Sequence, residues 1–240
     1  MELEVRLFAT LKDRVGRDRI QVSVEQPATV QDLTRAIGQA YPELAPALPS
    51  ALVAVNKAFA GQETTLSPGD ELAVFPPVSG GASSGYSHPT FFLVTAETID
   101  LAAIHTHLTQ PDIGAIVTFA GSVRGETRRE GLPPATIYLE YEAYQEMAEA
   151  KMGQIAREIW KRWPMVKGVA IVQRIGKLSI GETTTLVAVA AGHRDQGAFE
   201  AARYGIDRLK EIVPVWKKEV GQDQSVWIEG DYRPTETDND

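Results

Sequence analysis

The first 25 residues alternate between apolar and polar positions. Leu3, Val5 and Leu7 are separated by charged residues, and the segment IQVSVE at 20–25 repeats the alternation. Successive side chains of a strand point to opposite faces, so each run predicts a strand with one buried face. The segment between them, DRVGRD, is rich in turn-forming residues, and the two runs together predict a hairpin.

A helix and two more strands are predicted next. Thr29 precedes apolar residues at helical spacing, and Pro42 marks the expected end of that helix, because the residue before a proline avoids helical angles. The alternating runs ALVAVN at 51–56 and ELAVFPP at 71–77 predict strands separated by the turn SPGD. Two strands, a helix and two strands are the order of a β-grasp unit, in which a sheet wraps one helix.

The rest of the chain predicts a larger α+β unit. Apolar residues at helical spacing predict helices at 146–163 and 196–210, and Pro164 ends the first of them. Alternating and β-branched runs predict strands. Because no internal repeat is visible, we expect two unlike domains joined at about 82–88. The predicted strands are DIGAIVTFAGS, TIYLEYEAY, VAIVQRIG, TTTLVAVAAGHR and VPVWKKEV.

Composition narrows the class of protein. The 240 residues are 43% hydrophobic, which suffices for a packed globular core, and no window approaches the roughly 18 to 20 apolar residues of a membrane helix. The N-terminus is unlike a signal peptide, so we expect a cytoplasmic protein without a membrane partner. The net charge of -8 argues against nucleic acid as a partner. Without cysteine, the chain has no thiolate nucleophile, so any sulfur chemistry needs sulfur carried in another form.

Gly80 and Gly81 are the first candidates for chemistry. They stand between the apolar segment FPPVS and the small residues ASSG. Two readings are open: a flexible linker, or a carboxyl terminus that must enter another protein's narrow site, since glycine adds no side chain and allows an extended approach. No metal site is expected, because His105 and His107 have no third ligand in view.

The segment VAAGHRDQGAFEA is the second candidate. Asp195 is placed to cap the helix predicted from 196, which would put His193 and Arg194 at a helix N-terminus, where amide hydrogens and the dipole favour an anion. The alternative is that His193 ends a strand and Arg194 is a solvated surface residue. The residues by themselves do not decide between a phosphate site and a surface loop.

Lysines near the C-terminus are the third candidate. Lys210 lies at the predicted end of a helix, where the dipole stabilises a cation. In the strand VPVWKKEV, alternation puts Lys217 and Glu219 on one face. They can form a surface ion pair, or two lysines can act together to stabilise charge on a transferring group and move protons. Arg124 lies in a glycine-flanked loop after a strand, where it can reach a ligand.

Residues 1–81 resemble the small, ubiquitin-like sulfur-carrier subunit of molybdopterin synthase. The resemblance is carried by VRLFATLKDRVG, by VAVNK and by SPGDELAVFPPVSGG, which ends at Gly81 where chains of that family end. The second half resembles the large, catalytic subunit of the same enzyme. Its motifs are GAIVTFAGSVRG, LEYEAY, RIGKLSIGE, AGHRDQGAFEA and LKEIVPVWKKE. The chain thus resembles a natural fusion of the two subunits.

The resemblance implies a function in molybdenum cofactor biosynthesis. In that family an adenylating enzyme activates the carrier's terminal glycine, a sulfur donor converts it to a thiocarboxylate, and two sulfurs pass to cyclic pyranopterin monophosphate to form the dithiolene of molybdopterin. By motif, Arg124, His193 and Arg194 would hold the pterin phosphate. Lys210 and Lys217 would face the reacting centres, and Glu219 would orient a lysine. No permanently bound cofactor or metal is implied, and the large subunit is expected to pair with itself.

The peptide bond after Gly81 departs from the family pattern. An amide carbonyl offers no free carboxylate to adenylate, so we expect a protease to cut after Gly81, within a small, polar segment of the kind that proteases favour. The alternative is an uncut fusion that has no sulfur-transfer activity and serves as an assembly or pterin-binding protein. The expected parts are a β-grasp carrier domain at 1–81, a linker and cleavage region at 82–90, a catalytic domain at 91–232 and an acidic, disordered tail at 233–240.

Overall fold

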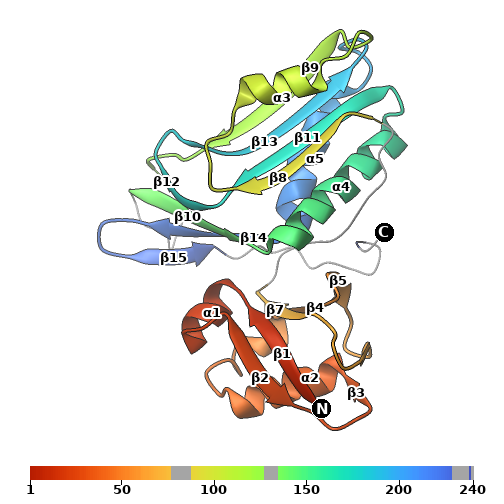
Figure 1. Cartoon of the computed structure of the whole chain (residues 1–240). Helices are drawn as coiled ribbons and strands as arrows, with labels where there is room; N and C mark the ends of the chain where they lie inside the picture. The colour runs from red at the N-terminus through yellow and green to blue at the C-terminus, as the bar shows by residue number, and fades with distance from the viewer. Residues whose placement is uncertain (77–87, 127–134, 229–237, 239–240) are drawn as a thin grey trace.

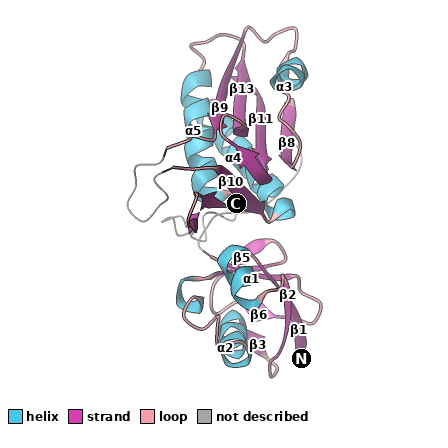
Figure 2. Cartoon of the chain, turned by 90° about the vertical axis from the view of Figure 1, so that its left-hand side faces the viewer, coloured by secondary structure: helices cyan, strands magenta, loops and turns pink. Residues whose placement is uncertain are grey.

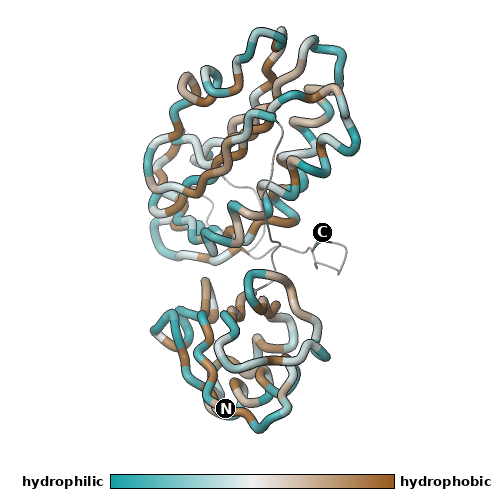
Figure 3. The backbone as a smooth tube through the Cα atoms, turned by 45° about the vertical axis from the view of Figure 1, so that its right-hand side comes forward, coloured by the Kyte–Doolittle hydropathy of each residue, from teal (hydrophilic) through white to brown (hydrophobic). Residues whose placement is uncertain are grey.

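The chain folds into two units with separate apolar cores, which form the lower and upper parts of Figure 1. The computed structural model describes residues 1–76, 88–126, 135–228 and 238. In both units brown, hydrophobic segments alternate with teal, hydrophilic ones along the backbone (Figure 3). Within the described residues, no helix is long and apolar enough to cross a membrane.

The first unit is a mixed five-stranded sheet wrapped around one helix, which confirms the predicted β-grasp order. The strand order is β2-β1-β7-β4-β5, with β1 and β7 parallel. Thr29 begins helix α2 in a capping box with Asp32, and the helix buries Leu33 and Ile37 against the sheet. The elements are β1 (Glu2–Leu7), α1 (Ala9–Val15), β2 (Arg19–Ser23), β3 (Ala28–Thr29), α2 (Val30–Ala40), η1 (Leu48–Ser50), β4 (Leu52–Val55), β5 (Ala58–Ala60), β6 (Thr65–Leu66) and β7 (Leu72–Phe75).

The connection between the first two strands differs from the prediction. Strands β1 and β2 pair antiparallel as expected, but the segment that joins them contains helix α1 in addition to a turn. This helix buries Leu11 in the core of the first unit and ends at Gly16, whose φ of 74° is left-handed. A helix of seven residues is too short to show a helical period in the sequence, so the pattern did not reveal it.

The second unit is built on a sheet with the order β8-β11-β13-β9 and helices on both faces, as Figure 2 shows. Strand β11 serves two cores: Val169 and Ile171 pack with helices α4 and α5, whereas Ala170 and Val172 pack with α3. Helices α4 and α5 confirm the two predicted helices, while the short α3 is not evident in the sequence pattern. The elements are β8 (Thr90–Thr95), α3 (Leu101–Leu108), β9 (Ala115–Ser122), α4 (Gln145–Arg162), β11 (Val166–Arg174), β13 (Thr183–Ala191) and α5 (Ala198–Ile212).

A second sheet of this unit, with the order β12-β10-β14-β15, packs against the first unit. Its strands are β10 (Tyr138–Ala143), β12 (Gly176–Ser179), β14 (Val215–Val220) and β15 (Ser225–Ile228). Trp216 of β14 stacks on Phe8, with 5.3 Å between ring centroids, and lies 5.7 Å from the ring of Phe75. We call this aromatic contact and its neighbours the interface cluster; its buried members are Phe8, Ala9, Ala54, Ala73, Phe75, Tyr144, Met147 and Trp216.

Charged groups surround the interface cluster. The Tyr144 hydroxyl donates a hydrogen bond to Glu71 of the first unit, and Arg6 lies 3.3 Å from the same carboxylate. The Arg6 guanidinium also stands 4.8 Å from the centre of the Tyr144 ring. Burial and the adjacent Glu71 carboxylate raise the pKa of Tyr144, so this tyrosine remains a neutral donor across the interface.

One residue of the predicted tail is described, and it is buried. The Asp238 side chain lies 2.6 Å from Arg208 of α5, and the Asp238 carbonyl accepts a hydrogen bond from Lys151 of α4. Asp238 is 2% exposed, so the expectation of a disordered tail does not hold at this residue, because two cations, Arg208 and Lys151, bind it. The predicted Gly80 and Gly81 terminus and most of the predicted linker lie outside the described residues.

Candidate active site

Strand β14 presents the predicted lysine and carboxylate on one face. Lys217 lies opposite Tyr141 of β10, and Glu219 lies opposite Leu139. Residues directly opposite in an antiparallel pair share a face, so these four side chains project to the same side of the sheet. Trp216, which lies between them in sequence order, projects to the other side, against the first unit. The alternation predicted for this strand is confirmed.

A buried carboxylate links this face to the loop after β9. Glu219 is 3% exposed and accepts a hydrogen bond from the Thr136 hydroxyl. The Thr136 backbone N–H donates to the Gly125 carbonyl at 3.0 Å, which holds the exposed Arg124 near the Glu219 end of β14. Sequence reasoning missed Thr136, because a threonine at the start of a strand gives no signal of its contact with a residue far along the chain.

A small apolar cluster lies on the same face of the sheet as Glu219. Val123, Leu139 and Leu178 form a small buried cluster, and Tyr141 packs against it. Burial raises the pKa of the Tyr141 hydroxyl, so this group stays protonated and can donate a hydrogen bond. A half-buried lysine, a buried carboxylate and a neutral phenol thus share one partly desolvated face, where electrostatic interactions are stronger than in water.

Lys210 lies on the last turn of α5, as predicted, and its side chain is exposed. The helix ends at Ile212 and β14 begins at Val215, so Lys210 and Lys217 flank one short connection. The cation at the helix end is stabilised by the dipole whatever its chemical role. Its position permits both the structural and the catalytic interpretation.

The loop between β13 and α5 carries His193 and Arg194, both exposed, but it differs from the prediction at Asp195. Helix α5 begins at Ala198 with Gly197 as its N-cap, and no side chain caps it. Gly197 has a φ of 84°, and a Cβ there would lie 2.3 Å from the Trp163 ring, so only glycine fits. The prediction that Asp195 caps the helix is therefore wrong: its carboxylate lies 2.7 Å from His193 Nδ1 instead.

Arg124 and the His193–Arg194 loop lie at opposite ends of one sheet. In the pairing of β9 with β13, Ser122 lies opposite Thr183, and Ala115 lies opposite Ala191. Arg124 follows the first end and His193 follows the second, so roughly 25 to 30 Å of strand separates them. A single chain does not bring the three predicted phosphate ligands together.

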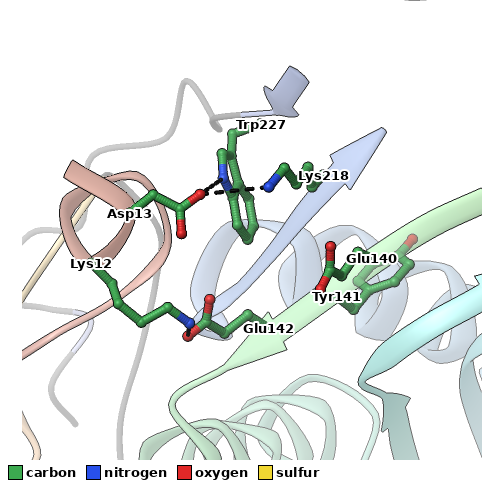
Figure 4. Close-up of a pocket in the computed structure, with 7 residues that line it drawn as sticks. All are labelled: Lys12, Asp13, Glu140, Tyr141, Glu142, Lys218 and Trp227. Atoms are coloured by element: carbon green, nitrogen blue, oxygen red, sulfur yellow. Dashed lines mark hydrogen bonds and ion pairs between the residues drawn. The ribbon is translucent and has the colours of Figure 1, made fainter. Parts of the chain in front are cut away.

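The crevice between the two units has a volume of about 260 Å³ and is lined from β14 by Lys218, which projects to the face of the strand opposite to that of Lys217. Figure 4 shows that side chains of both units meet in it. Lys12 lies 2.5 Å from Glu142, and Asp13 accepts from Trp227 Nε1 at 2.9 Å and lies 3.5 Å from Lys218. Lys12 and Lys218 are therefore each paired with a carboxylate. The crevice is a polar part of the interface between the units, and neither of its lysines is left unpaired to bind a substrate. Its lining residues are Lys12, Asp13, Glu140, Tyr141, Glu142, Lys218 and Trp227.

Comparison with known proteins identifies both halves. The MoaE protein family matches residues 94–212, and the ThiS family matches residues 5–81. The molybdopterin synthase catalytic subunit of Halalkalibacterium halodurans is 43% identical over 144 residues, which are 60% of this chain and 88% of that protein. This chain belongs to the molybdopterin synthase family. The synthase catalytic subunit of Bacillus subtilis is 42% identical over 144 residues, which are 60% of this chain and 87% of that protein.

A solved structure supports the same conclusion. The crystal structure of molybdopterin synthase from Staphylococcus aureus has a TM-score of 0.53 and 42% identity, and the match covers 58% of this chain and 97% of that chain. The protein is therefore a sulfur-transferring enzyme of molybdenum cofactor biosynthesis that carries a ubiquitin-like ThiS domain on the same chain. Within the described part of the chain, no three His, Asp or Glu side chains are grouped to hold a metal ion.

Proposed function

We propose that this molybdopterin synthase transfers sulfur from a glycine thiocarboxylate at Gly81 to cyclic pyranopterin monophosphate, producing the dithiolene of molybdopterin. The thiocarboxylate sulfur is the nucleophile, because the chain has no cysteine to supply one. Lys210 and Lys217 stabilise negative charge at the acyl and enolate-like centres and move protons. Glu219, fixed by Thr136, orients Lys217 from the same face of β14.

The observation that supports this proposal is that the two faces of strand β14 have different roles. Trp216 receives the carrier domain on one face, and Lys217 and Glu219 stand on the other. The segment from Phe75 to Gly81 spans at most about 20 Å when extended. The Phe75 ring lies 5.7 Å from the ring of Trp216, and Trp216 adjoins Lys217 in β14, so a tail of this length that starts at Phe75 is long enough to reach Lys217. The carrier domain is thus docked where it can serve its own catalytic domain.

Sulfur transfer requires a free carboxyl group at Gly81, because an adenylating enzyme cannot activate the amide that joins Gly81 to Ala82. We propose that a protease cuts this bond and that the new terminus then meets an adenylating enzyme and a sulfur donor. The interface cluster would hold the two fragments together after the cut, because its four buried aromatic side chains contact one another without the linker. These side chains are Phe8, Phe75, Tyr144 and Trp216.

Intact-mass spectrometry of the untagged protein from its own cells tests the processing step. We expect fragments that end at Gly81 and begin at Ala82, with part of the smaller one heavier by a sulfur-for-oxygen exchange. A thiocarboxylated fragment that ends at another residue would refute the cleavage site. A single uncut chain under all growth conditions would contradict the proposal and favour the assembly or pterin-binding role.

The phosphate ligands suggest a site shared by two copies. Strand β9 is an edge of its sheet and exposes Phe119 near its middle. If two β9 edges pair antiparallel across a twofold axis, the Ser122 end of one copy meets the Ala115 end of the other. Arg124 of one copy then approaches His193 and Arg194 of its partner, and each dimer contains two such sites.

Mixing two inactive variants tests the shared site. Arg124→Ala and His193→Ala are each expected to lose most of the activity, because each removes a phosphate ligand from every site. After the two proteins are unfolded and refolded together, half the dimers are mixed and each has one intact site, so about a quarter of the wild-type activity is expected to return. If all three ligands acted within one chain, mixing would restore nothing, which is the outcome that would contradict the shared site.

A further inference from the structure

Two ion pairs of opposite polarity cross the interface between the units. Lys12 of α1 lies 2.5 Å from Glu142 of β10, so in this pair the carrier domain supplies the cation. The next residue, Asp13, lies 3.5 Å from Lys218 of β14 and accepts a hydrogen bond from Trp227 Nε1 at 2.9 Å, so in this pair the carrier domain supplies the anion. Figure 4 shows both pairs in the same crevice.

The catalytic domain presents its half of this pattern on one face of a sheet. Glu140 of β10 lies opposite Lys218 of β14, which in turn lies opposite Trp227 of β15. Residues directly opposite on paired strands share a face, so these three side chains form a row across the sheet. Glu142 stands two residues after Glu140 in β10 and projects to the same face. One strand therefore offers carboxylates and its neighbour offers a cation.

These ion pairs discriminate between partners in a way that the interface cluster does not. Apolar burial has no direction, so an apolar patch can cover Trp216 whatever charges surround that patch. The ion pairs add little affinity, because the Lys12 side chain remains 33% exposed and that of Asp13 remains 45% exposed. The opposite order of charges is costly, however, because like charges placed together at an interface repel.

We propose that this crevice selects the carrier domain. It accepts a β-grasp domain that has a cation and then an anion at the positions of Lys12 and Asp13, and it rejects a domain that has these charges in the opposite order. The inference rests on the proposed function, in which the docked domain is the sulfur carrier. Selection becomes necessary once cleavage frees the carrier domain from its tether, because carriers from other chains then compete for the same face of the sheet.

Transposing the two charges tests the proposal without a change in composition or net charge. Each unit has its own apolar core, so the fragments can be separated after cleavage at a protease site inserted at 82–88, and calorimetry gives their dissociation constant. The carrier variant Lys12→Asp/Asp13→Lys should bind at least about ten-fold more weakly than the wild type, because both pairs become repulsive. The control is Arg35→Glu, which reverses a charge in an exposed pair with Asp32 on α2 and should leave the dissociation constant unchanged.

Reversing the pair of Lys12 and Glu142 provides a second test that misfolding cannot imitate. A Glu142→Lys catalytic fragment should bind the Lys12→Glu carrier at least about ten-fold more tightly than the wild-type carrier, and the wild-type catalytic fragment should have the opposite preference. A misfolded fragment would lose affinity for both partners instead.

An unchanged dissociation constant in the transposed variant would overturn the proposal, as would a Glu142→Lys fragment that still prefers the wild-type carrier. Both experiments measure docking and not sulfur transfer. Failure of sulfur transfer with the two preferences intact would therefore refute the proposed function and support selection by the crevice, so the two failures are distinguishable.

Discussion

Replacing Lys217 with alanine is expected to lower kcat for sulfur transfer by at least about 100-fold, with little change in folding. Lys217 stands half-buried on the same face of β14 as the buried Glu219 and opposite the neutral Tyr141. A cation held in such a partly desolvated place can stabilise charge that develops in the transition state without reorganisation of water. The assay is conversion of the pterin precursor with supplied thiocarboxylated carrier, which removes any dependence on cleavage after Gly81.

Two further variants make this test specific. Lys161→Ala removes an exposed lysine from the end of α4 and should keep the full rate, because this lysine is remote from β14. Lys210→Ala should also lower the rate if the lysines on both sides of the α5–β14 connection contribute to the chemistry. Full activity in folded Lys210→Ala and Lys217→Ala would mean that the catalytic roles are wrong and that both residues are ordinary surface lysines.

Replacing Phe8 with alanine is expected to weaken docking of the carrier domain by at least about 30-fold, a loss of roughly 2 kcal/mol or more. The Phe8 ring stacks on Tyr144 and on Trp216, with centroids at 5.0 and 5.3 Å, and it is 6% exposed. It is outside the core of the first unit, so the carrier domain should still fold. A protease site inserted into the 82–88 segment separates the two fragments, and calorimetry gives their dissociation constant.

The exposed Phe199 of α5 provides the matched control for this experiment. Phe199 is 59% exposed, so Phe199→Ala removes an equal aromatic area without removing a buried contact. Its dissociation constant should equal that of the wild type. An unchanged constant in Phe8→Ala would show that the interface cluster does not hold the carrier domain, and the argument that the carrier serves its own catalytic domain would fail with it.

The local sequence pattern was sufficient to predict most helices and strands and to assign the side chains of β14 to its two faces. The period of two in VPVWKKEV put Lys217 with Glu219 and Trp216 with Lys218 before any contact was known, since side chains of a strand alternate whatever the strand packs against. The short helix α1 and the role of Asp195 were not predictable in this way. For α1 the local signal was compatible with a turn, and burial of Leu11 in the core of the first unit accompanies the helix instead. For Asp195 it was compatible with a helix cap, but α5 begins at Ala198, after Gly197 packs closely on the distant Trp163, and the Asp195 carboxylate contacts His193.

The sequence by itself determined the two units, their order along the chain, and the residue types available for binding an anion and stabilising charge. Only the tertiary structure decided that Trp216 faces the carrier domain while Lys217 faces away from it, that Thr136 holds Glu219, and that Arg124 and His193 end opposite edges of one sheet. The physical reason is that periodicity depends on neighbours along the chain, whereas a site depends on strand register and packing between residues that the sequence separates widely.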